Sequence, residues 1–339
     1  MSKPNPCDRK IFNLISAQEW HLDRLYAEYT REFGTIFRNY NGRMTEARKK
    51  SFDNALGRFN DDLERLFREQ IETSFSLSNA CTDDFIKNYI KDMGVPSEQV
   101  ETMLASNAGA AKSFIKRKAG GSFLSDRVVS VTKGTREAVN LLLESGIVNG
   151  RSAADMATDL KKYLKEPERR FRRLRNEEGK LVLSQPAKNY NPGQGVYRSS
   201  YKNALRISRN EVNIAYRTND FERRKTMPFV MGQRIQLSAS HVVRDICDFL
   251  VGSYSKDFKF VGWHPMCKCV SNSIVLPREK FKSYLAGGNI DQRHLVKGIP
   301  SKAQKYLDKN SKQIKGWSNT PYFIRDNFKA SNNGFDLNI

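Results

Sequence analysis

The sequence predicts a mainly helical α+β protein, and three observations support this. From about residue 16 to residue 145, apolar residues recur at spacings of three and four, as they do along amphipathic helices. Segments with the alternating pattern of a β-strand appear only later in the chain. Three of the five cysteines gather between residues 247 and 269. Helices should therefore dominate, with a small sheet beside a cysteine cluster.

A chain of 339 residues can bury more than one core. We expect a helical N-terminal domain over residues 1–135. A mixed domain with a small β-sheet and a Cys/His cluster should follow over residues 136–277. A basic C-terminal extension should complete the chain over residues 278–339.

The N-terminal domain should contain long amphipathic helices. Apolar stripes run through Trp20–Phe37 and Phe52–Phe67, and a shorter one through Asp83–Met93. We interpret these stripes as core-facing surfaces. The alternative is that they pack on partner helices in an assembly.

Two short segments of the later chain predict strands. Asn176–Gly179 has the composition of a hairpin turn, and Lys180–Leu183 after it reads as a strand. Arg234–Ser238 alternates polar and apolar residues, which also predicts a strand.

A long helix is expected between these strands, from about Ser199 to Arg224. Glu211 lies on its apolar side, because Ile207 precedes it by four residues and Ala215 follows it by four. A carboxylate in that place must be paired or hydrogen-bonded if it is buried. The alternative is a surface helix with Glu211 at the edge of its contact.

The charge of the chain is strongly basic. Lysine and arginine number 58 against 37 acidic residues, which gives a net charge of +21 and a pI near 9.8. Such a surplus attracts polyanions such as DNA, RNA or acidic protein surfaces. The densest candidates for nucleic-acid binding are Arg169, Arg170, Arg172, Arg173 and Arg175. A solvated helix face is the other interpretation of this run.

The C-terminal extension is also basic. Basic residues greatly outnumber acidic ones over Arg278–Lys329, and Ser301–Asn310 predicts an amphipathic helix. Trp317, Tyr322 and Phe323 indicate that this tail docks on another surface, either of this chain or of a neighbour.

Targeting and redox features point to a protein made in the cytoplasm. No apolar run approaches the roughly 20 residues of a membrane helix, so no membrane partner is expected. The N-terminus lacks the apolar segment of a signal peptide. An odd number of cysteines without such a signal argues against a disulfide scaffold.

The cysteine cluster has the general layout of a structural zinc site. Zinc takes four ligands, which usually come from two short segments. Cys247, Cys267 and Cys269, with either His241 or His264, would supply them, and Pro265 would fix the backbone after His264. The single residue between Cys267 and Cys269 is a tighter spacing than usual. A metal-free packed cluster and a late disulfide are the alternatives.

No known catalytic motif is present in the sequence. The zinc deaminase pattern of His-x-Glu with Pro-Cys-x-x-Cys is missing, as are the phosphate-binding GxxxxGK[ST], HExxH and GxSxG. We therefore expect a protein that is not an enzyme.

Residues from about Gly146 to Val275 resemble the phage head-morphogenesis family, whose members are minor head proteins like protein F of phage Mu. The matching pieces are Gly150–Ser152 at a helix start, Arg206–Glu211 on a later helix, then Asp245, Cys247 and Gly252, and finally His264-Pro265-Met266-Cys267-Lys268-Cys269. The last piece is the specific one. One departure is that Arg244 stands where the family commonly has a first cysteine, so His241 is a candidate to replace it as a ligand.

The resemblance implies a minor head protein of a tailed phage or prophage. Such a protein acts in head assembly at the portal and in the DNA-filled capsid, so its location would be the virion. Its expected partners are the portal protein, other head proteins and, through non-specific electrostatics, packaged DNA. The alternatives are a zinc-stabilised nucleic-acid-binding protein outside the virion, or a cargo enzyme or toxin delivered through this domain.

Overall fold

The computed structural model describes residues 6–38, 40, 43–106, 109–148, 159–160, 164–165, 173–183, 199–317, 320–331 and 334–338. Helices make up 63% of the described residues and strands 10%, which confirms the mainly helical α+β class. The predicted helix start at Gly150–Ser152 lies outside the described residues.

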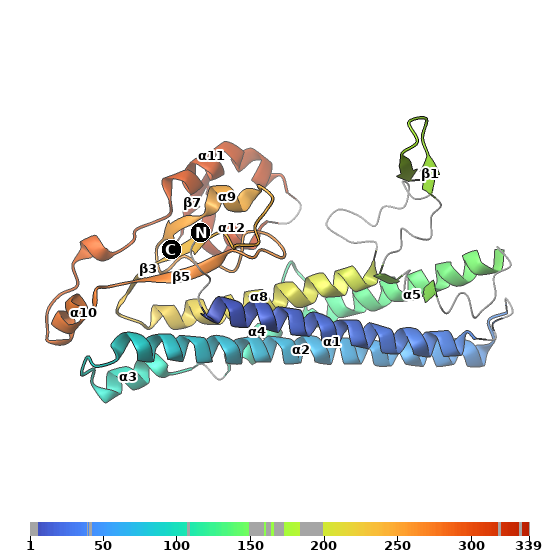
Figure 1. The fold of residues 1–339 in the computed structure, drawn as a ribbon, viewed down its shortest axis with the longest axis horizontal. Coiled ribbons are helices and arrows are strands. Elements are labelled where there is room, and N and C mark those ends of the chain that lie inside the picture. Colours follow the sequence, from blue (N-terminus) through green and yellow to red (C-terminus); the bar gives the residue numbers. More distant parts are fainter. Residues whose placement is uncertain are drawn as a thin grey trace. The chain divides into compact units, whose positions relative to one another are not determined.

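Helices account for most of the described residues up to Lys225 (Figure 1). Their bounds are α1 (Pro6–Ile36), α2 (Glu46–Ile90), α3 (Ser97–Leu104), α4 (Ala110–Ile115), α5 (Leu124–Val148) and α8 (Ser200–Lys225). The two stripes predicted over 52–67 and 83–93 belong to one continuous helix, because no glycine or proline capable of breaking α2 stands between them.

The later chain alternates short strands and helices. Its elements are β1 (Arg173–Arg175), β2 (Leu181–Leu183), β3 (Val230–Gln236), α9 (Ile246–Leu250), β4 (Gly252–Tyr254), β5 (Val270–Val275), α10 (Arg278–Leu285), the 3₁₀ helix η2 (Gln292–His294), α11 (Ser301–Lys315), α12 (Tyr322–Asn327), β6 (Phe328–Ser331) and β7 (Gly334–Leu337). The pairs β1–β2 and β6–β7 are antiparallel hairpins, and the third sheet is antiparallel with the order β4-β3-β5.

The predicted hairpin and strand are both present. β1 and β2 flank the turn at 176–179, as expected. β3 begins at Val230, four residues before the predicted start. Its first four residues are all buried, so they do not show the alternation by which a half-exposed strand is recognised.

The chain forms two compact units. The helical unit comprises Ser16–Gln70 and Ile115–Arg209, and the sheet unit comprises Met1–Ile15, Ile71–Phe114 and Asn210–Ile339. Neither unit is contiguous in sequence, because α1, α2 and α8 each contribute residues to both. The division into domains at 1–135, 136–277 and 278–339 stays a prediction.

The core of the helical unit contains the predicted apolar stripes. Its buried side chains include Leu22, Tyr26, Tyr29, Phe33, Phe52, Leu56, Phe59, Leu63 and Phe67. Tyr26 meets Phe59 and Tyr201 edge-on, with ring centroids 5.1 Å apart in each pair. Trp20 departs from the prediction, since it is 56% exposed and stacks under Arg24.

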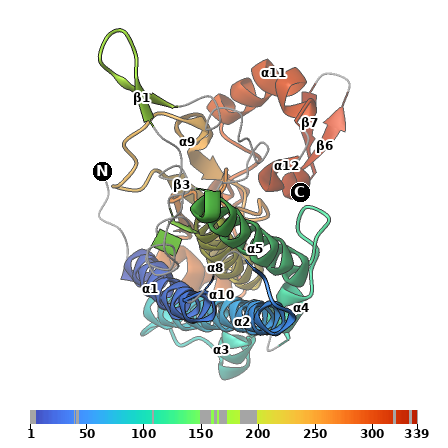
Figure 2. The same cartoon turned by 90° about the vertical axis from the view of Figure 1, so that its right-hand side faces the viewer.

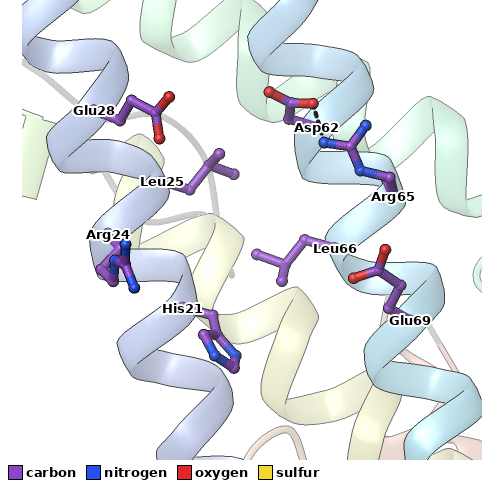
Figure 3. Close-up of a pocket in the computed structure, with 8 residues that line it drawn as sticks. All are labelled: His21, Arg24, Leu25, Glu28, Asp62, Arg65, Leu66 and Glu69. Carbon is purple, nitrogen blue, oxygen red and sulfur yellow. Dashed lines mark hydrogen bonds and ion pairs between the residues drawn. The ribbon is translucent and has the colours of Figure 1, made fainter.

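The helical unit also has a surface pocket of about 230 Å³ between α1 and α2 (Figure 3). Leu25 and Leu66 face each other across it. Its rim mixes basic and acidic side chains: His21, Arg24, Glu28, Asp62, Arg65 and Glu69. Asp62 and Arg65 already form an ion pair there. Because both signs of charge are present, the rim selects neither an anion nor a cation.

In the sheet unit, α2 and α8 approach closely through serines. The Ser74 hydroxyl donates to the Val212 carbonyl and the Ser78 hydroxyl to the Tyr216 carbonyl, both at 3.0 Å. Both pairs are separated by 138 residues, so the two helices run parallel here. Figures 1 and 2 show α1 beside α2 as well.

The C-terminal extension packs on the cysteine cluster within the sheet unit. Phe323 is buried with Cys247 and Trp263 in one core, to which the partly buried Tyr322 also belongs. α11 packs against α9 and β7, and α12 against β6 (Figure 2). The tail therefore docks on its own chain, while Trp317 remains 40% exposed.

A disulfide joins Cys7 of α1 to Cys81 of α2, with 5.9 Å between the Cα atoms. The odd number of cysteines argued against a disulfide scaffold and did not indicate this single bond. Cys247, Cys267 and Cys269 stay free. Among the described residues, no helix is both long and apolar enough to cross a membrane.

Candidate metal centre

The first segment of the centre is the start of α9. Asp245 is the N-cap of this helix, and its carboxylate accepts a hydrogen bond from the Cys247 amide at 2.7 Å. Asp248 completes a capping box by accepting from the Asp245 amide at 2.8 Å. These caps satisfy amides that a helix start leaves without partners. They hold the Cys247 thiol in the first turn, where it is buried.

The second segment is a tight turn over His264–Cys267. The Cys267 amide donates to the His264 carbonyl at 3.1 Å, and Met266 has a φ of 63°. A type II turn needs this positive φ at its third residue and favours proline at its second, which is where Pro265 stands. The Met266 amide also donates to the Asn210 side chain on α8 at 2.7 Å. This contact ties the turn to a long helix.

These two segments bring three potential ligands together. The Cys247 sulfur lies 3.8 Å from the Cys267 sulfur and 3.2 Å from Nε2 of His264. The ligand atoms of all three residues lie within 4.8 Å of one another. The group could therefore hold a metal ion.

The hydrogen bond that His264 makes through Nδ1 leaves Nε2 as the ring nitrogen that could bind a metal. Nδ1 lies 2.7 Å from the Pro265 carbonyl oxygen, which can only accept, so Nδ1 carries the proton. Nε2 is the ring nitrogen that lies beside Cys247, 3.2 Å from its sulfur. Metal-binding histidines are commonly oriented by such a bond from the other ring nitrogen.

The distances agree with tetrahedral zinc coordination. Zinc–sulfur bonds of about 2.3 Å at a tetrahedral angle place two sulfurs about 3.8 Å apart. The separation of Cys247 and Cys267 matches this value. For one sulfur and one nitrogen the same geometry gives about 3.6 Å, so Cys247 and His264, at 3.2 Å, are slightly too close.

The pKa values of the Cys247 and Cys267 thiols are shifted in opposite directions. Hydrogen bonds from Cys247 and Cys269 hold the pKa of Cys267 well below its ordinary value. The bond to Cys267 in turn raises the pKa of Cys247. One thiolate is thus stabilised by two neighbouring thiols, which is the charge state from which a soft cation is bound.

Cys269, the third cysteine that the sequence suggested as a ligand, is also buried, but its sulfur is not part of the group formed by Cys247, His264 and Cys267. The Arg217 guanidinium on α8 donates to its carbonyl at 2.5 Å and lies over the Phe260 ring. Arg217 is itself buried. A buried guanidinium held in this way fixes the backbone that follows Cys267.

Further acidic and imidazole groups stand at the edge of the centre. Nε2 of His264 is 3.2 Å from Asp245. Nε2 of His241 is 3.0 Å from Asp248, and His241, Asp245 and Cys247 form a second group within 4.8 Å. Of the two histidines that the sequence suggested, His264 is grouped with both Cys247 and Cys267, whereas His241 is grouped with only one cysteine, Cys247.

The other sequence-predicted residues hold the frame of the centre. Gly252 begins β4 opposite Ile235, with a φ of 149°. A β-carbon there would come within 2.5 Å of Pro300 Cγ, so both its conformation and its surroundings require glycine. Pro265 is exposed at the turn. Glu211 is only 2% exposed, which excludes its placement at a surface edge.

The predicted arginine run is only partly described. Arg169, Arg170 and Arg172 lie outside the described residues, and Arg173 is described only as a backbone position in β1. Arg175 is exposed in β1 and donates to the Gly179 carbonyl across the hairpin at 2.7 Å.

Sequence reasoning missed three residues of the centre. Asn210 and Arg217 reach it from α8, and Tyr322 reaches it from the C-terminal extension. Burial raises the pKa of Tyr322, and the nearby charges of Cys267 and Cys247 add to this. None of the three lies near the cysteines in sequence, so no local spacing could have indicated them.

Comparisons with protein-family models, with curated proteins and with solved structures found no match to this chain.

Proposed function

We propose that this chain is a minor head protein of a tailed phage or prophage, acting in head assembly at the portal and in the DNA-filled capsid. The proposal rests on the head-morphogenesis resemblance of the sequence. One observation supports it most: Asp245 and Cys247 from one matching piece lie at a single centre with His264 and Cys267 from the next and most specific piece. Residues that match as a sequence pattern therefore also form one structural unit.

We further propose that the ion is zinc and that its role is structural. Two thiolates and an imidazole suit zinc better than they suit calcium or magnesium, which prefer oxygen ligands. When bound, the metal would cross-link α9 to the turn at 264–267. Cys247, Cys267 and His264 would hold it, and Cys269 is the candidate that the sequence suggested for the fourth ligand.

A centre of this kind fits an assembly protein. Its cysteines are buried in a core that also contains residues of α9 and of the C-terminal extension. The net charge of +21 is compatible with a location beside packaged DNA, which is negatively charged. The same features would serve a zinc-stabilised nucleic-acid-binding protein outside the virion, or a cargo protein. Those alternatives differ in where the protein is found.

The test is to locate the protein in particles. Portal-containing assembly intermediates and mature heads of the encoding phage would be separated on gradients, and the chain quantified by mass spectrometry. We expect a copy number far below that of the major capsid protein, and portal assemblies that retain the chain. Absence from both intermediates and heads would contradict the proposal, and it would favour a role outside the virion.

A further inference from the structure

The helix α11 presents a row of lysines on its outer face. Its sequence contains five lysines and a single acidic residue, Asp308. The lysines are Lys302, Lys305, Lys309, Lys312 and Lys315, and all five are exposed. Spacings of three and four residues place them along one side of the helix. We call this row the lysine stripe.

The opposite side of α11 anchors it in the sheet unit. Ala303, Leu307 and Ile314 are all buried in the core that contains Cys247 and Trp263. At 100° per residue these positions point away from the centre of the lysine stripe. The stripe therefore lies on the side of α11 opposite its buried face.

The charges of the stripe are not cancelled by carboxylates. Lys302 donates to the Asp248 carbonyl at 2.7 Å, and Lys315 to the Ser331 carbonyl at 2.6 Å. Within the part of the chain that the structure describes, no carboxylate pairs with Lys305, Lys309 or Lys312. Asp308 instead accepts from the side chain of Gln304. The helix thus has a net charge of +4 directed at solvent.

We propose that the lysine stripe is a binding surface for the phosphate backbone of double-stranded nucleic acid. From Lys302 to Lys315 the helix rises about 20 Å, which corresponds to about six phosphates along one strand of a duplex. Lysine contributes a mobile point charge rather than a planar fork, which suits contact without reading of sequence.

Other polyanionic surfaces fit less well. A helix that binds a membrane surface needs an apolar face free to enter the lipid, and the apolar face of α11 is buried in its own core. Lysine is depleted from the centres of protein–protein interfaces. No aromatic residue lies between the lysines on the outer side to stack on unpaired bases, since Tyr306 packs against Phe249. A duplex backbone remains.

This inference rests on the proposed function for its ligand, packaged DNA, but it is tested without particles. The purified full chain would be titrated with a fluorescent 30-base-pair duplex of arbitrary sequence across a range of NaCl concentrations. The test variant is K305Q/K309Q/K312Q. The matched control is K49Q/K50Q/K87Q, which removes three exposed lysines of α2 and the same total charge.

We expect the test variant to bind the duplex about 100-fold more weakly than wild type at 0.1 M NaCl. The slope of log K against log salt should become shallower by about 2.7, because each phosphate contact contributes about 0.9. The control should change both quantities much less. An unchanged melting temperature would show that each variant is folded.

Three results would overturn the inference. The first is an equal loss in both variants, which would assign binding to overall charge. The second is an unchanged test variant. The third is a loss confined to vesicles of phosphatidylserine and phosphatidylcholine, measured in parallel, which would assign the stripe to membranes. A chain that binds DNA through the stripe yet is missing from heads would contradict only the proposed function.

Discussion

At the scale of single residues, the two histidines differ in what surrounds Nε2. In His264 this nitrogen lies 3.2 Å from the Cys247 sulfur and 3.2 Å from an Asp245 carboxylate oxygen, because Nδ1 is engaged by the Pro265 carbonyl. In His241 it lies 3.0 Å from Asp248. Asp248 has a pKa below its ordinary value, through the Asp245 amide first and the bond to His241 second. His241 therefore belongs to the capping arrangement of α9, and Cys247 is the one cysteine with which it is grouped.

This difference predicts the outcome of replacing each histidine. Purified wild type should contain about one zinc per chain. His264→Gln should weaken zinc binding by more than about 100-fold, since loss of even an outer hydrogen-bond partner costs about 10- to 100-fold. His241→Gln is the matched control and should keep the metal. Metal analysis and competition with a chromophoric chelator would measure both.

The cysteine variants complete that test. Cys247→Ser and Cys267→Ser should each release the zinc and lower the melting temperature by about 5–10 °C. Cys269→Ser should do the same if Cys269 is the fourth ligand, whereas Asp245→Asn should not. A wild type that is free of metal and equally stable after treatment with a chelator would refute the centre.

At the scale of elements, the parallel packing of α2 and α8 depends on small side chains. Ser74 and Ser78 are buried one helical turn apart, and each donates to a carbonyl of α8. Their small volume permits the close approach, and their hydroxyls find partners where a larger polar group would not fit. The helix contact is therefore set by volume more than by hydrogen bonding.

Two double variants would separate volume from hydrogen bonding. Ser74→Ala/Ser78→Ala should lower the free energy of unfolding by about 1–2 kcal/mol, because each hydroxyl loses one net hydrogen bond. Ser74→Leu/Ser78→Leu should lower it by about 2–6 kcal/mol, because four-carbon side chains force the helices apart.

The exposed Ser76 on the same helix provides the control, and Ser76→Leu should change stability by less than about 0.5 kcal/mol. Denaturant unfolding measures all three variants. A leucine pair as mild as the alanine pair would show that side-chain volume does not limit the approach of α2 to α8.

At the scale of the whole molecule, the chain leaves the sheet unit after residue 15 and returns to it at residue 71. The Cys7–Cys81 disulfide joins the segments on either side of this excursion, across a sequence separation of 74 residues. A cross-link that closes a long loop restricts the unfolded chain most. The bond therefore stabilises the association of the N-terminal segment with α2.

We expect Cys7→Ser/Cys81→Ser to lower the free energy of unfolding by about 2–4 kcal/mol relative to the oxidised wild type. Because these residues are separate from the metal centre, the variant should retain its zinc. Wild type in a thiol-free reductant should fall to the stability of the variant, and the variant should not respond to the reductant. A wild type whose stability is indifferent to reduction would show that the bond contributes nothing.

Much of the fold was predictable because it rests on local periodicity. The stripes through Trp20–Phe37 and Phe52–Phe67 identify helices, and the long helix predicted near 199–224 is found at 200–225. The sequence pattern did not predict the start of β3, because consecutive residues there are buried and do not alternate with exposed ones. It also predicted a buried position for Trp20, which is exposed.

The candidate site was predictable only in part. Cys247, His264 and Cys267 were visible because soft ligands are rare and lay in two short segments. Asn210, Arg217 and Tyr322 were not, because ordinary polar residues on distant elements have no distinguishing pattern in the sequence. The same limit hid the disulfide, since the pairing of Cys7 with Cys81 depends on how α1 lies against α2.

By itself, the sequence determined the helical class, the strongly basic charge and the set of residues able to bind a metal. All three depend on composition and on spacing within one or two helical turns. Only the tertiary structure decided that His264 rather than His241 is grouped with two cysteines, that Glu211 is buried, and that the C-terminal extension docks on its own chain. Those outcomes depend on contacts between segments far apart in sequence, where the direction of each side chain is set by packing.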